Sequence, residues 1–417
     1  MEKIKPRKEQ VEFLKWEMGA FFHFGIRTFY EGHRDWDGKV MPLEGFNPTG
    51  LDCENWITTA KDAGCTYAIL VCKHHCGYAN WPSKYSDYHV GLTPWKDGKG
   101  DVVKEFVDAC RKHDIKVGLY YSPAEAGYRE RSAKEYDDYF IFQISELLSN
   151  YGKVDYLWFD GCGSEGHEYD KPRIVKAIRD LQPEILIFNM WDPDTRWVGN
   201  EAGVAGVHNV NQVSALDFSI LTGGQKDELP ETKFLPSECD FMMRDRNWFY
   251  SEYDVHTVKS VEELVGLYYY SVGCGSNFLI NIGPDRRGLL PDVDAQRLRD
   301  FGAEIRRRFA NPIPSTVQET ENVIAIDFGK EYFINHVVLG EDISEGDGVE
   351  SFDVLVRSRL IYRPTTVYSG TAIGHKRIIQ IPYIRASGVI VRVNKANGEY
   401  RLLKPEAFLV KSPELVL

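Results

Sequence analysis

The chain has 417 residues, a formal net charge of −12, and a composition that is 43% hydrophobic and 27% charged. This length predicts two domains, or one large barrel with an appended domain. The acidic balance argues against nucleic acid or an anionic membrane as the main partner, because both attract basic surfaces. Aromatic residues make up 13% of the chain, which suits a site that stacks on sugar rings and equally suits a rich core.

The N-terminal segment and the cysteines bear on the compartment. The first 22 residues are charged before they become apolar and lack the apolar centre and cleavage site of a signal peptide. The eight cysteines form no CxxC pair and no dense framework, which is typical of reduced thiols. We therefore expect a cytoplasmic protein, whereas loss of a leader ahead of residue 1 would indicate a secreted or periplasmic one.

Strand-like apolar runs alternate with helix-like periodic segments through roughly the first 300 residues. The expected strands are 19–25, 66–75, 115–122, 154–159, 184–191 and 276–284. The expected helices are 52–64, 101–114, 133–150, 172–182 and 260–275. This alternation with short connections predicts an α/β fold, a (β/α)8-like, TIM-type barrel over residues 1–310. The irregular stretch 198–248 receives no assignment.

The pattern changes after residue 310. The segment 311–315, NPIPS, is typical of a linker. Short β-type runs separated by Gly, Asn and Asp follow it at even spacing. They predict a C-terminal antiparallel β-sandwich over residues 316–417.

Polar side chains occur where the first three predicted barrel strands end. These are His23 in the first, His74 and His75 in the second, and Tyr121 in the third. Side chains at successive strand ends would line one mouth of a barrel. Adjacent strand residues point to opposite faces, so at most one of the two neighbouring histidines faces inward unless the strand has ended. A structural histidine is the alternative, and no HExxH spacing predicts a metal site.

The fourth predicted strand ends in a carboxylate, Asp160, followed by a Gly-rich turn. A carboxylate at the C-terminal end of a buried strand is where α/β barrels keep their catalytic groups. The structural alternative is an aspartate that caps the next helix. Three tryptophans could supply stacking walls, although each alone is more typical of a core: Trp56, Trp81 and Trp158.

Glycoside hydrolysis needs a second carboxyl group beside the scissile bond. One group attacks or activates water, and the other holds a proton for the leaving oxygen. Glu201 lies in a Gly-rich loop 41 residues after Asp160 (201 − 160). Glu238, in FLPSECD, is its rival at what could be a later strand end, and Glu165 is a third candidate.

Six segments taken together resemble glycoside hydrolase family 29, the α-L-fucosidases. In chain order they are FFHFG, FNP, KHHCGYANWPSKYSDY, GDVVKEFVDACRKHDIKVGLYYSP, YLWFDG and NFLINIGPDRRGLLP. The resemblance covers about residues 12–300. It implies a (β/α) barrel with a C-terminal β-sandwich, and the C-terminal segment is itself similar to discoidin-like domains. It also implies retaining release of terminal α-L-fucose from oligosaccharides or glycoconjugates through a covalent fucosyl-enzyme, without a cofactor.

The resemblance also implies roles for single residues. The family nucleophile, the Asp of WFDG, falls on Asp160. The family histidines that hold the fucose hydroxyls fall on His23, His74 and His75. The remaining residues that we expect to contact substrate are Trp56, Trp81, Tyr121, Trp158 and Glu238.

The segment TRWVGNEAGVAG is similar to a motif of the branch that acts on α-1,3/1,4-linked fucose, which implies that Glu201 is the acid/base. PSECD and NWFYSEYD also resemble that branch, except that Asn247 stands where the branch usually has Gly. Cys76 replaces the Asp of the usual HHDG, and the segment SPAEAGYRE differs from the family pattern. An inactive or fucose-binding relative, and a hydrolase of a related sugar such as an α-L-galactoside, therefore remain alternatives. A metal-dependent hydrolase using the paired histidines is a more distant one.

Overall fold

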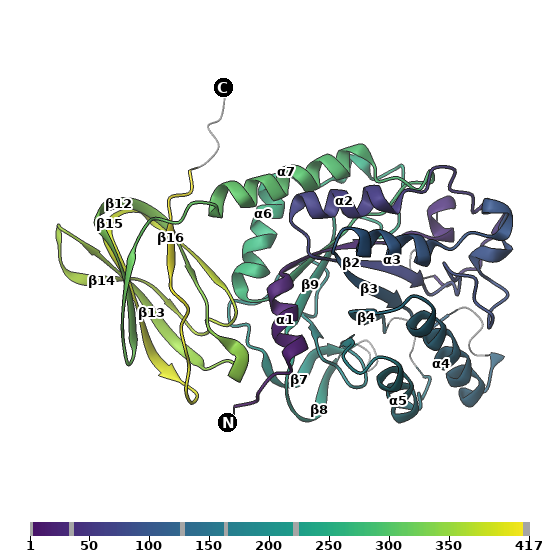
Figure 1. Cartoon of the computed structure of the whole chain (residues 1–417), viewed down its shortest axis with the longest axis horizontal. Helices are drawn as coiled ribbons and strands as arrows, with labels where there is room; N and C mark the ends of the chain where they lie inside the picture. The colour runs from purple at the N-terminus through teal and green to yellow at the C-terminus, as the bar shows by residue number, and fades with distance from the viewer. Residues whose placement is uncertain (1–2, 33–36, 126–129, 162–165, 220–224, 412–417) are drawn as a thin grey trace.

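The computed structural model describes residues 3–32, 37–125, 130–161, 166–219 and 225–411. Two lobes lie side by side (Figure 1): an α/β lobe formed by most of the chain and a β-rich lobe formed by its C-terminal part. The change between them falls after helix α7, which ends at Phe309, and before strand β11, which begins at Thr316. The segment that we interpret as a linker, 311–315, lies between these two elements.

Eight parallel strands form the sheet of the first lobe, in the order β5-β4-β3-β2-β1-β10-β9-β6. A parallel bridge between Phe188 and Thr195 links the two edges, so the sheet is a nearly closed barrel. The predicted TIM-type barrel is confirmed. Its strands are β1 (Met18–Phe22), β2 (Tyr67–Lys73), β3 (Lys116–Tyr121), β4 (Tyr156–Phe159), β5 (Leu186–Phe188), β6 (Arg196–Trp197), β9 (Ser237–Met242) and β10 (Asn277–Asn281).

The helices form because their apolar positions repeat on one face, and a polar side chain caps the N-terminus of α2, α3, α4, α5 and α6. In α3, for example, Asp101 accepts a hydrogen bond from the backbone N–H of Lys104, while Val103 and Phe106 are buried. The helices are α1 (Lys8–Trp16), α2 (Cys53–Ala63), α3 (Val102–Lys112), α4 (Ala133–Asn150), α5 (Lys171–Leu181), α6 (Val261–Tyr270) and α7 (Asp292–Phe309).

Helix α1 precedes the first strand and closes the N-terminal end of the barrel. Its Phe13 and Trp16 pack against Tyr67 and Tyr156, which begin strands β2 and β4. This end of the barrel interior is therefore an aromatic core. The opposite end, where the strands finish, is left for the site.

Side chains alternate between the barrel interior and the helix layer. On β4 the inward residues are Tyr156 and Trp158, and Asp160 follows two residues later on the same side. Gly19 on β1 makes room at the closed end, since a Cβ there would lie 2.3 Å from the ring of Tyr67.

The stretch 198–248, to which the sequence pattern assigned no elements, contains an antiparallel hairpin between β6 and β9. Its strands are β7 (Gln212–Ser219) and β8 (Gln225–Phe234). The hairpin forms its own two-stranded sheet beside the barrel. It separates the loop that carries Glu201 from the strand that carries Glu238.

The C-terminal lobe is antiparallel, as predicted. Its two longest strands are bulged, and the sheet encloses one apolar core. The lobe packs on the N-terminal side of the barrel: Lys376 forms an ion pair with Glu17, just ahead of β1, and Ile378 lies against Gly273, ahead of β10. Its strands are β11 (Thr316–Thr320), β12 (Val323–Leu339), β13 (Val349–Ser358), β14 (Ile361–Gly370), β15 (Arg377–Ala396) and β16 (Glu406–Phe408).

Two further observations concern the described ranges alone. Within them, every helix is too short or too polar to cross a lipid bilayer. The seven cysteines that they contain are all buried and unpaired. Cys162 lies outside the described residues.

Candidate active site

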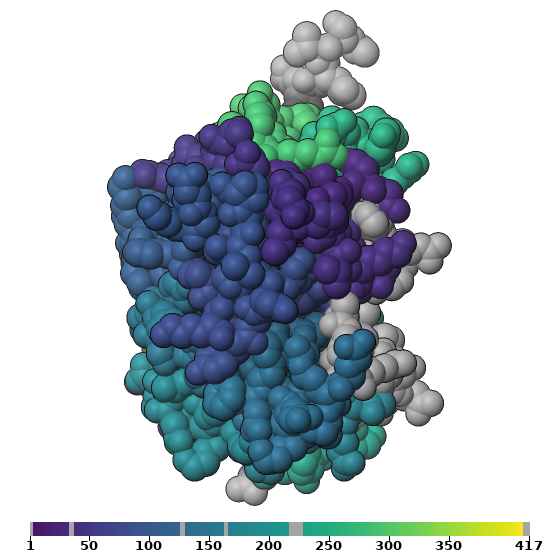
Figure 2. Space-filling view, turned by 90° about the vertical axis from the view of Figure 1, so that its right-hand side faces the viewer, coloured from purple at the N-terminus to yellow at the C-terminus, as the bar shows by residue number. Residues whose placement is uncertain are grey.

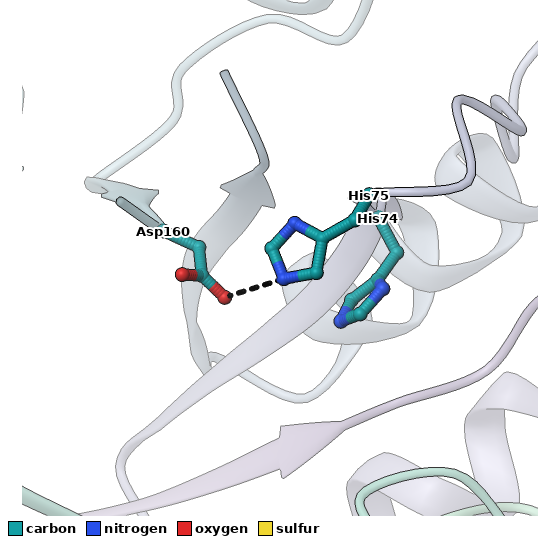
Figure 3. A group of neighbouring side chains, drawn as sticks. All are labelled: His74, His75 and Asp160. Carbon is teal, nitrogen blue, oxygen red and sulfur yellow. Dashed lines mark ion pairs between the residues drawn. The ribbon is translucent and has the colours of Figure 1, made fainter. Parts of the chain in front are cut away.

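Asp160 lies at the C-terminal end of the barrel, directly after β4. The Tyr120 hydroxyl donates a hydrogen bond of 2.7 Å to its Oδ2, and Nε2 of His75 lies 3.5 Å from the same oxygen. The Asp160 side chain keeps 21% of its surface exposed. Figure 3 shows His75 turned toward the carboxylate, with His74 beside it. The carboxylate is thus oriented by the barrel and still accessible.

This end of the barrel faces away from the C-terminal lobe. Figure 2 shows the corresponding face, which is built mainly from the first 200 residues in purple to teal, with no yellow residue of the β-rich lobe in view. Because the described contacts of that lobe include Glu17 and Gly273, ahead of β1 and β10, they lie toward the opposite end of the strands.

His75 is anchored through one ring nitrogen. The Ser122 hydroxyl donates to the carbonyl oxygen of Ala124 at 2.8 Å, so it accepts the hydrogen bond of 2.6 Å from Nδ1–H of His75. Nε2 is then the atom that faces Asp160. A neutral His75 offers an acceptor there, and a protonated His75 offers a donor.

His23 is anchored in the same manner by Asn281 at the end of β10. The Asn281 amide nitrogen donates to the carbonyl oxygen of Trp248 at 2.7 Å, so its Oδ1 is the acceptor that faces Nδ1 of His23, also at 2.7 Å. The hydrogen of His23 therefore resides on Nδ1, and Nε2 is an acceptor. Burial lowers the pKa of His23 to about 3, so the ring is neutral above that pH.

His74 completes the group of histidines. Its ring lies 6.0 Å from that of His23 and 4.1 Å from that of His75, between ring centroids. It stacks nearly parallel to Tyr120, at an interplanar angle of 9°. Burial, and then the charge of a protonated His75, lower the pKa of His74 well below its usual range. Both neighbouring histidines can face the site because strand β2 ends at Lys73, ahead of them.

Aromatic rings surround these polar groups. Trp158 lies one layer below Asp160 and stacks between Tyr120 and Phe188, at centroid distances of 5.4 and 4.2 Å. Phe249 packs edge-on against His23 and His74, at 5.4 and 5.1 Å. Further rings in contact with the group are Phe21 and Trp248. The site thus offers apolar faces next to hydrogen-bonding nitrogens, which is a combination suited to a sugar.

Glu201 lies in the loop after β6 and is exposed. A bridge between Ala202 and Phe241 fastens this loop to β9, and Gly203 follows with φ +75° where a Cβ would lie 2.5 Å from the Phe241 ring. Asp240, on the inward side of β9, accepts a hydrogen bond of 2.5 Å from Nε1 of Trp197. Burial, and then the charge of Glu201, raise the pKa of Asp240 well above its usual range. Glu201 and Asp240 are therefore electrostatic neighbours.

Glu238 lies deeper in the barrel than the sequence pattern suggests. It is fully buried and receives hydrogen bonds from Tyr67 at 2.7 Å, Trp158 at 2.9 Å and Tyr156 at 3.3 Å. Burial raises its pKa to about 7, against the lowering effect of these three donors. Because its neighbours belong to the closed end and middle of the barrel, we correct its expected role as a substrate contact or acid/base to a structural one.

Three expected aromatic contacts also require correction. Tyr121 points outward, and its hydroxyl donates to Oε1 of Gln143 on α4. Trp56 and Trp81 likewise lie in the layer between strands and helices, where their indole N–H groups bind Gly288 O and Glu146. Parallel strands are buried on both faces, so aromatic residues occur in this layer as often as in the pocket.

Several residues of the site were not expected from the sequence. Tyr120, the inward neighbour of Tyr121 on β3, takes its place in the site. Asn281 is the last residue of β10 and His23 directly follows β1, so both show the same signal of a polar side chain at a strand end. The other residues that we missed are Ser122, Trp197, Asp240, Trp248 and Phe249. The rival carboxyl group Glu165 lies outside the described residues.

His74, His75 and Asp160 could also hold a metal ion, since one ligand atom from each lies within 4.8 Å of the others. Two imidazoles and a carboxylate are a ligand set of catalytic zinc sites. The family resemblance assigns the same three residues to sugar binding (His74 and His75) and to nucleophilic attack (Asp160). Their geometry alone is compatible with a metal site and with a fucosidase site.

Comparison with known proteins identifies the family of the chain. A family model described as Alpha-L-fucosidase matches residues 1–307. Alpha-L-fucosidase 1 of Arabidopsis thaliana is 31% identical over 94% of this chain and 85% of its own length. A glycoside hydrolase 29 family member from an unknown rumen bacterium is 31% identical with a TM-score of 0.89, covering 100% of this chain and 79% of that one. A mutant GH29 fucosidase of Ruminococcus gnavus, solved in complex with fucose, is 25% identical with a TM-score of 0.86, over 99% and 96% of the two chains. This chain is therefore a glycoside hydrolase and belongs to the alpha-L-fucosidase family, glycoside hydrolase family 29.

Proposed function

We propose that the protein is a retaining exo-α-L-fucosidase that releases terminal α-L-fucose from oligosaccharides or glycoconjugates. The observation that carries the proposal is the position of Asp160: a partly exposed carboxylate directly after β4, held by Tyr120 and faced by His75. A nucleophile must be oriented and reachable at once, and this carboxylate is both.

In the proposed mechanism, Asp160 attacks the anomeric carbon of the fucosyl unit and the glycosidic C–O bond breaks. Glu201 donates a proton to the departing oxygen, so the first product is an alcohol and a covalent fucosyl-enzyme. Glu201 then takes a proton from water, which releases fucose with its configuration retained. Retention requires the two carboxyl groups to approach to about 5–5.5 Å. An exposed loop position for Glu201 fits a loop that closes on substrate.

The histidines would bind the sugar hydroxyls in this scheme. His23 offers an acceptor at Nε2, because its Nδ1 hydrogen is used on Asn281. His75, beside Asp160, would contact a hydroxyl close to the anomeric carbon. Phe249 and Trp248, which contact the His23 ring, would offer apolar surface to the sugar and to its C6 methyl group. Trp158 would support the site from below, because Tyr120 and Phe188 stack on it.

We further propose that the enzyme prefers α-1,3- and α-1,4-linked fucose. This preference rests on the similarity of the loop around Glu201 to the branch with that specificity. The loop is held by the side chain of Asn200, which accepts from the N–H of Ala202 and donates to the carbonyl oxygen of Val204. Such bracing suits a loop that contributes the acid/base group and the leaving-group side of the site.

The test compares hydrolysis of an aryl α-L-fucoside with that of fucosyl-α-1,3- and fucosyl-α-1,2-oligosaccharides, with Asp160→Ala as the control. We expect wild type to release fucose from the α-1,3 substrate in preference to the α-1,2 substrate, and the variant to release none. Proton NMR of the first-formed anomer tests retention. Equal rates on both linkages would contradict the branch assignment, and inversion would contradict the mechanism.

The other readings have distinct outcomes in the same assay. An aryl α-L-galactoside that is cleaved faster than the fucoside would assign the chain to that related sugar. Binding of fucose without turnover would indicate a binding relative, and attention would turn to Cys76. Loss of activity with EDTA, restored by a divalent metal, would favour metal chemistry at His74, His75 and Asp160.

A further inference from the structure

A small cavity borders His74. The residues lining it include Gly25, His74, Tyr78 and Asn80. The centre of a water molecule can explore about 10 Å³ inside it. This is the space that one buried water needs, and such a water also needs two to four polar partners.

Apart from Arg27, whose guanidinium pairs with Asp37, three lining residues carry a polar side-chain atom without a hydrogen-bond partner within the part of the chain that the structure describes. The atoms are Nδ1 of His74, the hydroxyl of Tyr78 and Oδ1 of Asn80. Their residues are only 5%, 3% and 1% exposed. A buried polar atom without a partner costs about 1–3 kcal/mol, so three around one cavity require an explanation.

We propose that one buried water molecule binds all three of these atoms and thereby places the hydrogen of His74 on Nε2, the nitrogen that faces the site. Its bonds replace the protein anchors that His23 and His75 receive from Asn281 and Ser122. All three histidines would then have one anchored ring nitrogen.

The hydrogen-bonding capacities of the lining groups determine the orientation of this water. Both amide hydrogens of Asn80 are already donated, to the carbonyl oxygens of Phe24 at 2.6 Å and Val71 at 2.7 Å. Its Oδ1 can therefore only accept a hydrogen from the water. The hydroxyl of Tyr78 has no hydrogen-bond partner among the described residues, so it can donate to the water.

One hydrogen of the water then remains for Nδ1 of His74. With Nδ1 as the acceptor, both hydrogens of the water and the hydroxyl hydrogen of Tyr78 are used. If Nδ1–H of His74 donated instead, the water would accept from His74 and from Tyr78, and one of its own hydrogens would have no acceptor among the three groups. The arrangement with Nδ1 as acceptor therefore leaves fewer hydrogens unpaired. Arg27 also lines the cavity, and its guanidinium forms an ion pair with Asp37 at 2.5 Å, which orients its charge toward that carboxylate. Burial keeps the His74 ring neutral, in agreement with a single ring hydrogen.

The consequence for recognition rests on the proposed function. His23 would present an acceptor and His74 a donor, with ring centroids 6.0 Å apart. Such a pair can bind neighbouring sugar hydroxyls in one direction, donating to the first and accepting from the second. The arrangement discriminates against a ligand that cannot supply this order.

The tautomers can be measured without any substrate. Two-bond ¹H–¹⁵N correlation spectra of the full-length protein, labelled with ¹⁵N-histidine, distinguish the protonated ring nitrogen from the bare one. Spectra of His23→Gln and His74→Gln assign the two rings. At neutral pH we expect the Nε2–H form for His74 and the Nδ1–H form for His23. The Nδ1–H form for His74 would overturn the proposal, whether or not the enzyme cleaves fucosides.

Tyr78→Phe tests the water itself, because it removes one hydroxyl and keeps the ring. We expect the His74 signals to shift toward those of a tautomer mixture, while the His23 signals stay in place. Tyr88→Phe is the matched control: Tyr88 packs edge-on against Tyr78, and its hydroxyl binds Met41 instead of the cavity. Unchanged His74 signals in Tyr78→Phe, or an equal shift in the control, would contradict the proposed role of the water.

A neutron structure of the wild-type protein provides a second measurement that does not depend on any variant folding. We expect nuclear density for one D₂O molecule in contact with His74, Tyr78 and Asn80, and deuterium on Nε2 of His74. Absence of that water from the cavity would overturn the proposal.

Discussion

The two ends of the barrel interior each contain a carboxyl group, but one is fully buried and the other is partly exposed to solvent. At the closed end, the Glu238 carboxyl group is fully buried and accepts hydrogen bonds from Tyr67, Tyr156 and Trp158. At the open end, the Asp160 side chain keeps 21% of its surface exposed and accepts a hydrogen bond from Tyr120. Both are carboxyl groups on inward-facing positions among aromatic rings.

The difference teaches which carboxyl group can react. Three protein donors converge on Glu238, and its burial excludes a substrate. Asp160 has an accessible carboxylate beside imidazole nitrogens, and those nitrogens are themselves oriented by Asn281 and Ser122. Residue type alone therefore does not distinguish a core carboxyl group from one that can react. The distinction comes from how exposed the carboxyl group is and from how many of its oxygen lone pairs already accept hydrogen bonds from the protein.

Replacement of the proposed nucleophile should have the largest effect. We expect Asp160→Ala to lower kcat on an aryl α-L-fucoside by roughly 10³-fold or more, because the proposed mechanism loses its attacking atom. The melting temperature should change little, since the side chain is partly exposed. Kinetics with the aryl fucoside and thermal unfolding of the same samples measure both effects.

The closed end supplies the control for this variant. Glu238→Gln removes a carboxylate of the same barrel interior, and we expect it to retain kcat within a few-fold of wild type. If Glu238→Gln were the inactive protein and Asp160→Ala the active one, the assignment of the two ends would be reversed.

Loss of the proposed acid/base should depend on the leaving group. We expect Glu201→Ala to lower kcat by about 10²-fold or more on an α-1,3-linked oligosaccharide, and far less on an activated aryl fucoside whose leaving group needs little protonation. Azide, which attacks without a base, should restore the second step. The measurement is the ratio of the two rates, with and without azide.

Asp240→Asn is the companion variant to Glu201→Ala, because Asp240 is the electrostatic neighbour of Glu201. The asparagine amide oxygen can still accept the hydrogen bond from Nε1 of Trp197. A leaving-group dependence as large in Asp240→Asn as in Glu201→Ala would move the acid/base role to Asp240. The same dependence in Glu238→Gln would move the role to the closed end and contradict the comparison outright.

Two neighbouring tyrosines of β3 allow a finer comparison, between the inside and the outside of the barrel. The hydroxyl of Tyr120 donates to Asp160, and that of Tyr121 donates to Gln143 on α4. A hydrogen bond to a charged group contributes about 1.5–3 kcal/mol, so we expect Tyr120→Phe to lower kcat/KM by about 10-fold or more. Tyr121→Phe should leave kcat/KM unchanged and lower the melting temperature slightly. Equal effects of both variants on kcat/KM would contradict the assignment of faces.

The tyrosine pair also shows how far the sequence could predict this molecule. Alternating apolar strands and periodic helices predicted the barrel, because those periods follow directly from backbone geometry. Polar residues at strand ends predicted His23, His74, His75 and Asp160, because parallel strands bring their ends together. Tyr120 and Tyr121 could not be told apart, because a strand buried on both faces shows no polar alternation.

Other residues were unpredictable for a different reason. Trp56 and Trp81 pack in the hydrophobic layer between the strands and the helices. Large aromatic side chains fill this layer just as they line a sugar pocket, so the residue type does not tell the two locations apart. Trp248 and Phe249 lie in a loop without periodicity, so no pattern places them. They reach the site because the amide of Asn281 binds the carbonyl oxygen of Trp248, a contact between residues 33 positions apart.

The last prediction concerns stability and expects the smallest effect on activity. It tests the closed end of the barrel through the pH dependence of the free energy of unfolding. The pKa of Glu238 is about 7 in the folded protein against 4.5 as its ordinary value. The folded state therefore binds the proton more tightly than the unfolded chain, and the free energy of unfolding falls as pH rises from about 4.5 to 7, by at most roughly 3 kcal/mol. The side chain in Glu238→Gln stays neutral at every pH and still accepts a hydrogen bond from Trp158, so the variant should lack this decrease in unfolding free energy.

Urea unfolding of the wild type and of Glu238→Gln from pH 5 to pH 8 measures the decrease. As the pH rises, the unfolding free energy of the variant should increase relative to that of the wild type. Parallel curves would mean that the carboxyl group pays no desolvation penalty, and the closed end would then not be the dry core that distinguishes it from the site of Asp160.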